Sequence, residues 1–358
     1  MSNIWWSHIS NASDFVDKVI KYASEGRATV LELPDYVPWR SAMDTCIEER
    51  LSYACSNRML KKVYDNESKK PGECILLNFC KPEKRLEFRP AKGYANFLAE
   101  QTDITLNNRF VWIKVKNQER ADAWLAFISE YQKALKKNGT TGGVFILEVK
   151  KLPQNIPTNL IIVSYDDNIC DYDRYAFNIL CAAGINENSN IKSYLSELVS
   201  NVVGNDIELS ALCMKPEYYR GILNDTYEAI KLIIDENDRS DGKPFVFEKN
   251  REQVDSGIWK TQIKTVFPVI EESRGTFVNR HSKEIEKQLP IKNDCGEEYC
   301  NPNDVEVGML LHFISSGIIK TTTKEHDLMK RLKEARNMLA HLNTIVFNDV
   351  EVIFNMEL

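Results

Sequence analysis

Three residues near the end of the chain have side chains suited to acid–base chemistry on a phosphate ester. The segment RNMLAH brings Arg336, Asn337 and His341 within a few residues of one another. An imidazole changes its charge near neutral pH and can serve as a general acid or base. A guanidinium can bind a phosphate and stabilise the charge that develops on it. The segment therefore places a possible general acid or base close to a group that can bind a phosphate.

The spacing of the neighbouring apolar residues predicts that this segment belongs to a helix. Asn337 and His341 are four residues apart, so we expect them on one face of it. The long side chain of Arg336 can swing towards that face. A second face is apolar and should pack against a core; it consists of Leu332, Ala335, Leu339 and Leu342.

RNMLAH resembles the R-N-x-x-x-H motif of the HEPN superfamily, helical bundles found in bacterial toxins, defence proteins and RNA-cleaving CRISPR effectors. The resemblance implies that His341 would act as general acid or base, that Arg336 would clamp the scissile phosphate, and that Asn337 would orient His341 or the phosphate. Two such motifs usually face each other across a dimer, which implies a homodimer. In other bundles of this kind the same segment, with Leu-Ala before the histidine, only fixes the packing. Both readings remain open.

Net charge limits how the chain could bind nucleic acid. The formal net charge is -6, whereas a protein that binds nucleic acid along a whole face usually carries a positive excess. Any RNA contact would have to use the basic run before the motif, which is also typical of a solvated helix face. This run contains Lys324, Lys330, Arg331 and Lys333.

The first half of the chain predicts a doubly wound, mostly parallel sheet. Five short apolar runs are unbroken rather than alternating, as expected for strands buried on both faces. They cover residues 28–33, 74–79, 109–115, 143–149 and 159–165. Helical patterns separate them, so we expect strand–helix–strand units with right-handed crossovers in an α/β domain over residues 1–185.

The first turn of this domain lacks the features that bind a nucleotide. After the first run, LPDYVPWRS contains neither the glycines nor the lysine of a phosphate-binding loop, and Pro34 and Pro38 supply no N–H donors. Only Arg40 and Ser41 could contact a phosphate. The strand ending at Lys114 also lacks the acidic residue expected for magnesium. The layout resembles a P-loop NTPase core of signalling and defence ATPases without its Walker motifs, so NTP hydrolysis is not expected; a flavodoxin-like sheet would give the same pattern.

Residues 186–358 predict an all-helical, HEPN-like domain, because amphipathic helical spacing recurs there between polar loops. The cysteines lie mostly in apolar segments, which indicates reduced thiols in a cytoplasmic protein. CGEEYC, residues 295–300, lacks the second ligand pair of a zinc site. We therefore expect no metal and no cofactor.

These patterns lead to three hypotheses of function. The first is a non-enzymatic adaptor of a bacterial, anti-phage defence system that binds partner proteins of that system. The alternative is a metal-independent HEPN-type endoribonuclease that uses Arg336, Asn337 and His341. The third is a nucleotide sensor without hydrolysis that uses Arg40 and Ser41 at the start of a helix.

Overall fold

The computed structural model describes residues 1–115, 117–292, 296 and 298–355. The chain forms two compact units, Met1–Asp173 and Arg174–Leu358. The division falls within helix α8 (Asp171–Cys181), earlier in the chain than the boundary at residue 185 that we expect from the sequence.

The first unit contains a five-stranded sheet in which every pairing is parallel. The strands lie in the order β2-β3-β4-β1-β5, which is a P-loop-like order, and this confirms the predicted fold class. Their bounds are Thr29–Glu32 (β1), Met59–Tyr64 (β2), Arg109–Lys114 (β3), Val144–Val149 (β4) and Ile161–Ser164 (β5).

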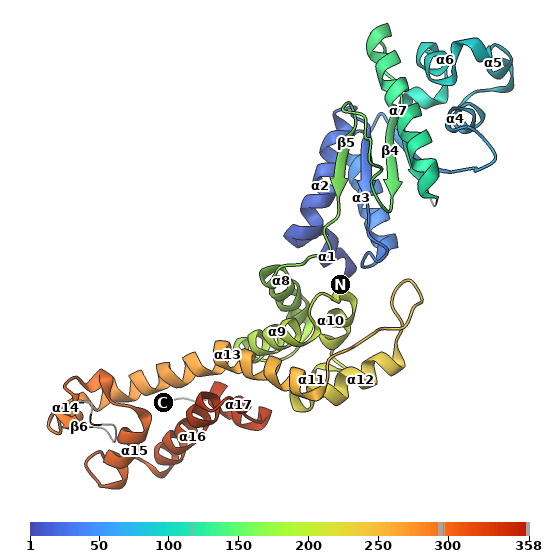
Figure 1. Ribbon diagram of the computed structural model, residues 1–358. Coiled ribbons are helices and arrows are strands. Elements are labelled where there is room, and N and C mark those ends of the chain that lie inside the picture. The colour runs from blue at the N-terminus through green and yellow to red at the C-terminus, as the bar shows by residue number, and fades with distance from the viewer. Residues whose placement is uncertain (116, 293–295, 297, 356–358) are drawn as a thin grey trace. The chain divides into compact units, whose positions relative to one another are not determined.

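Helices cover both faces of this sheet, as a doubly wound fold requires. Helices α2 (Ser10–Ser24) and α3 (Arg40–Ala54) pack against one face, while α7 (Gln118–Asn138) packs against the other (Figure 1). Gly139 ends α7 in the left-handed conformation, as its sequence predicts. The remaining helices are α1 (Ser2–His8), α4 (Pro71–Phe79), α5 (Pro82–Leu86) and α6 (Tyr94–Glu100), with short 3-10 turns at Pro90–Lys92 and Thr105–Asn108.

One of the five predicted strands is wrong. Residues 74–79 form the end of helix α4, and the missing strand is β2, which the sequence analysis did not predict. The sequence of α4 is mostly apolar because six of its nine residues are buried, and a Cβ on Gly72 would lie 2.3 Å from the Cβ of Tyr94 in α6. β2 is an edge strand with two lysines, so it never shows the unbroken apolar run of a central strand.

The second unit is helical apart from a two-stranded antiparallel hairpin, which the all-helical prediction did not include. Its helices are α9 (Ser189–Val203), α10 (Ile207–Cys213), α11 (Tyr219–Asn224), α12 (Thr226–Glu236), α13 (Arg251–Arg280), α14 (Ser282–Glu286), α15 (Val307–Ser315), α16 (Thr323–Ala340) and α17 (Phe347–Phe354). Strands β6 (Ile291–Lys292) and β7 (Glu298–Tyr299) form the hairpin, and 3-10 turns lie at Ala182–Gly184 and Pro302–Asp304.

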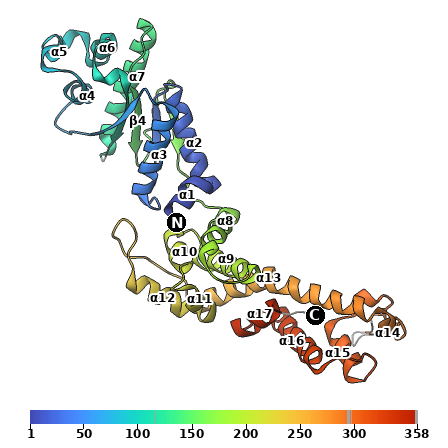
Figure 2. The same ribbon diagram turned by 180° about the vertical axis from the view of Figure 1, so that it is seen from behind.

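Helix α13 is the element around which the second unit packs. It contacts α9, α12, α16 and α17, and Figure 2 shows it extending past α16 and α17. A capping box starts it, in which Asn250 and Gln253 each bond the other's backbone N–H. The same device, made by Thr322 and Glu325, starts α16. The sequence therefore specifies where α13 and α16 begin.

Candidate functional sites

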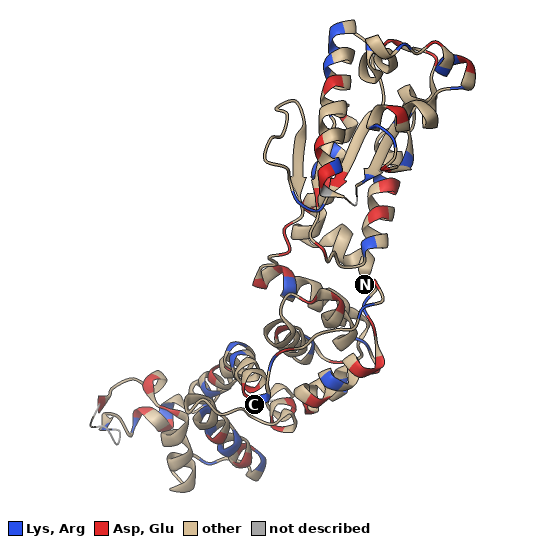
Figure 3. Ribbon diagram, turned by 45° about the vertical axis from the view of Figure 1, so that its right-hand side comes forward, with Lys and Arg blue, Asp and Glu red and all other residues tan. Residues whose placement is uncertain are grey.

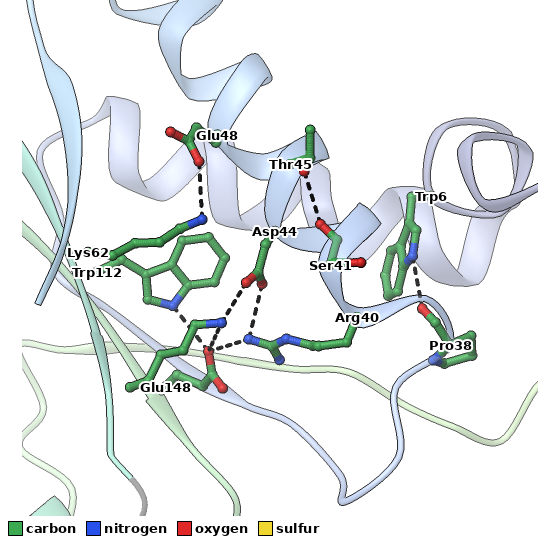
Figure 4. A network of polar contacts seen from close by, with 11 residues as sticks. Trp6, Pro38, Arg40, Ser41, Asp44, Thr45, Glu48, Lys62, Trp112 and Glu148 are labelled. Carbon is green, nitrogen blue, oxygen red and sulfur yellow. Dashed lines mark hydrogen bonds and ion pairs between the residues drawn. The ribbon is translucent and has the colours of Figure 1, made fainter. Parts of the chain in front are cut away.

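The first candidate site is the turn between β1 and α3, where a nucleotide's phosphates would bind in a sheet of this order. The indole N–H of Trp6 donates to the carbonyl oxygen of Pro38 at 3.1 Å and ties the turn to α1 (Figure 4). Trp39, just before α3, has left-handed backbone angles (φ 44°, ψ 56°), which cost energy for a residue with a side chain. The turn is therefore fixed by the Trp6 hydrogen bond and the left-handed Trp39, and it differs from the glycine-rich loop of a phosphate site.

The side chain of Arg40 turns from this site towards acidic residues. Its guanidinium pairs with the carboxylate of Glu148 in β4 and lies 3.1 Å from Asp44 (Figure 4). The ammonium of Lys114, at the end of β3, lies 2.5 Å from Asp44 and 3.9 Å from Glu148. The indole N–H of Trp112 also donates to Glu148, at 3.2 Å. Two cations and two carboxylates thus form a charge-balanced network at the strand ends.

Ser41, the other residue predicted here, takes no part in this network. It is exposed on the first turn of α3, and its carbonyl oxygen accepts from the hydroxyl of Thr45 at 3.0 Å. The sequence did not predict that Glu148 and Asp44 belong to this site. A single acid within the otherwise apolar run GVFILEV was the one available signal for Glu148.

The second candidate site is the C-terminal end of α16. Arg336 is half-buried and lies 3.4 Å from a carboxylate oxygen of Glu306 and 3.7 Å from one of Glu271 in α13. The side chain of Asn337 is exposed. Arg336 and Asn337 line one cavity of about 500 Å³ between α15, α16 and the hairpin, and the residues that line this cavity do not include His341. The structure therefore brings together two of the three motif residues.

His341 lies beyond the helix rather than on it. It is exposed and caps α16, which ends at Ala340. The next residue, Leu342, has a positive φ of 60°, and its N–H donates to the carbonyl of Leu339 at 3.2 Å. The N–H of Asn343 reaches the carbonyl of Met338 at 2.9 Å, which completes a Schellman cap.

The predicted apolar stripe is therefore wrong in one position. Leu332, Ala335 and Leu339 are buried, but Leu342 is 71% exposed because the chain has already turned away from the core. His341 precedes this turn, and its backbone N–H still donates to the carbonyl oxygen of Asn337 at 3.1 Å, so the two residues remain one helical turn apart.

We expect Leu342→Gly to raise the free energy of unfolding of the helical unit by about 0.5 kcal/mol. Glycine adopts a positive φ without steric cost, and this gain exceeds the extra flexibility of the unfolded chain. Urea unfolding followed by circular dichroism measures the difference. Leu342→Ala is the control, since it removes the same exposed side chain but keeps the Cβ. An equal gain from alanine would contradict the role of backbone strain.

The four basic residues before the motif have different surroundings. Arg331 pairs with Asp349 at 2.9 Å, and Lys333 lines the cavity with Arg336. Lys324 and Lys330 are exposed. Figure 3 shows basic and acidic residues interspersed along the helices of this unit, consistent with the negative net charge.

Neither a metal site nor a membrane span is found in the described part of the chain. No group of three or more potential metal-ligating side chains occurs among the described residues, and Cys295 of CGEEYC lies outside them. None of the described helices combines the length and apolar composition needed to cross a bilayer.

The chain matches no family model and no curated protein. Two similar solved structures are Trip13 of Rhizobiales (12% identity, TM-score 0.35) and a HORMA:CdnC:Trip13 complex of E. coli MS115-1 (10% identity, TM-score 0.32). Each alignment covers 63% of this chain and 88% of the other. At these TM-scores the similarity carries no argument about activity or partners.

Proposed function

We propose that the chain is a non-enzymatic interaction component of a bacterial, anti-phage defence system. The observation that carries this proposal is the network of Arg40, Asp44, Lys114 and Glu148 at the strand ends. A phosphate bound there would lie beside the carboxylates of Asp44 and Glu148, which repel it. It would also have to separate Arg40 from Glu148, and the half-buried charge of Glu148 would lose its closest cation. The α/β unit then serves as a scaffold for partner proteins.

The contacts of Arg336 support the same proposal for the helical unit. Its guanidinium lies near carboxylates from two other parts of the unit, Glu271 and Glu306, so its charge is compensated within the unit without a bound RNA. The placement in a defence system rests on the resemblance of RNMLAH to the HEPN motif.

A HEPN-type ribonuclease is the second candidate function. The observation that favours it is that Asn337 and His341 are both exposed near the end of α16, where a large substrate could contact them. In a homodimer, a second copy would supply the opposing motif, and Lys324 and Lys330 are exposed for RNA contacts. Nucleotide sensing is the third candidate, and the pairing of Arg40 with Glu148 counts against it.

An activity assay on the full chain distinguishes these candidates. We expect the wild type neither to hydrolyse ATP with magnesium nor to cleave a mixed RNA pool without metal. His341→Ala is tested beside it, with His326→Ala, near the start of α16, as the control. RNA cleavage that is lost in His341→Ala and retained in His326→Ala would overturn the proposal in favour of the ribonuclease. ATP hydrolysis that Arg40→Gln abolishes would contradict the scaffold role.

A further inference from the structure

The cavity between α15, α16 and the hairpin has the composition of a ligand site. Its volume of about 500 Å³ lies in the range of small-molecule pockets. Lys333, Arg336 and Asn337 line it from α16, and His312 lines it from α15. Three of these residues are one turn apart on one helix face, so their polar groups converge on the same space.

Lys333 is available to a ligand. Among the described residues it forms no ion pair, although acidic residues are frequent in this unit. Its side chain crosses Gly308 in the first turn of α15, where an added Cβ would lie 3.7 Å from the Cε of Lys333. The end of the Lys333 side chain therefore lies near the first turn of α15, where both Lys333 and Gly308 line the cavity.

Arg336 is only loosely held by its carboxylate neighbours. Its distances of 3.4 Å to Glu306 and 3.7 Å to Glu271 exceed those of a strong charge-assisted hydrogen bond. Glu271 has a closer partner, because Arg274 donates to it at 2.8 Å. Arg274 also donates to the carbonyl oxygens of Asn303 and Val305, which fixes the segment that leads into α15. Arg336 can therefore turn to an anion without leaving Glu271 unpaired.

We propose that this cavity binds the phosphate group of a small organic phosphate of nucleotide size. Lys333 and Arg336 would contact the phosphate, and Asn337 would donate its amide N–H. The cavity is larger than a bare phosphate needs, and its remaining wall includes Tyr299 and Met309, which suit the organic part. The proposal does not depend on the proposed partner binding and does not use His341.

Glu306 sets the affinity of this site. Its carboxylate lines the cavity and competes with a phosphate for Arg336. Removing that charge by Glu306→Gln should therefore tighten the binding of a phosphate.

Titration calorimetry of the full chain with adenosine 5′-monophosphate tests the proposal, with adenosine and inorganic phosphate as reference ligands. Lys333→Gln should weaken binding of the monophosphate about tenfold, the loss of one charge-assisted contact. Lys330→Gln, which makes the same change at an exposed position of α16 outside the cavity, should leave binding unchanged. Adenosine should bind much more weakly than its monophosphate.

The proposal would be overturned by no binding of the monophosphate, by equal binding of adenosine, by equal weakening in Lys333→Gln and Lys330→Gln, or by loss of binding in Arg40→Gln. The last would place the ligand at the strand ends of the sheet. A short RNA oligonucleotide that binds through Lys333 when the monophosphate does not would also overturn it. Unfolding curves of each variant establish that the fold is retained.

Discussion

Asp65→Asn is expected to lower the free energy of unfolding of the α/β unit by about 3 kcal/mol. Asp65 directly follows β2, and its side chain is 6% exposed. Its carboxylate accepts two hydrogen bonds from Arg120, at 3.0 and 2.6 Å, and one from the indole N–H of Trp124 at 2.9 Å. Asparagine keeps the shape of the side chain but leaves the guanidinium of Arg120 without its buried counter-charge.

Tryptophan fluorescence during urea unfolding measures this loss, because five of the six tryptophans lie in the α/β unit. Asp122→Asn is the control, since it removes an exposed carboxylate from the same helix as Arg120 and should change stability by less than about 0.5 kcal/mol. Equal unfolding midpoints for the two variants would contradict a stabilising role for this ion pair.

Because Asp65 is titratable, the difference in unfolding free energy between wild type and Asp65→Asn should depend on pH. Burial raises the pKa of Asp65, but the hydrogen bonds from Arg120 and Trp124 and the charge of Arg120 outweigh it, so that the pKa lies below the usual 3.8. A carboxyl whose pKa is depressed by folding contributes stability that is fully present above its unfolded pKa and is lost as the pH falls through the folded pKa. The stability gap between wild type and Asp65→Asn should therefore shrink as the pH falls below 3.8.

Gln262→Leu is expected to destabilise the helical unit by about 3 kcal/mol. The side chain of Gln262 in α13 is fully buried. Its amide donates to the carbonyl oxygen of Ile345 at 2.7 Å and accepts from the N–H of Ile345 at 2.8 Å. Leucine fills a similar volume but leaves both backbone groups of Ile345 buried without a partner, in the segment that follows His341.

Circular dichroism during urea unfolding follows the helices of both units, and the difference between the variant and wild type gives the change in the helical unit. Lys260→Leu, an exposed position on the same helix, is the matched control and should change stability by less than about 0.5 kcal/mol. The prediction fails if both leucine variants unfold at the same urea concentration.

The sequence predicted the parts of the fold whose burial is uniform. β1, β3 and β4 lie within the predicted runs because nearly all of their residues are buried. β5 is an edge strand with Ile162 and Ser164 exposed, and it was predicted because its sequence, unlike that of β2, contains no charged residue. A short apolar run does not distinguish a buried strand from a buried helix, which is why α4 was assigned wrongly. β2 escaped notice because an edge strand has one paired side and tolerates charged residues.

The candidate sites show a similar limit. Arg40 could be placed at a strand end from the local pattern, but its partner Glu148 is far away in the sequence and comes close only through the parallel pairing of β1 with β4. The spacing of RNMLAH predicted a shared helical face for Asn337 and His341. The end of the helix at Ala340 was not predicted, because the positive φ of the cap is adopted by Leu342 and the sequence has no glycine at that position to indicate it.

The four-charge network also restricts how the sequence can change. Replacing Arg40 alone removes a cation from beside two carboxylates, and replacing Glu148 alone leaves two cations sharing Asp44. Each of these single substitutions therefore leaves a half-buried charge without its partner. A path from this turn to a phosphate-binding loop, whether taken by natural drift or by design, requires coupled substitutions on α3, β3 and β4. The network thus acts as an epistatic barrier that keeps the turn in its present form.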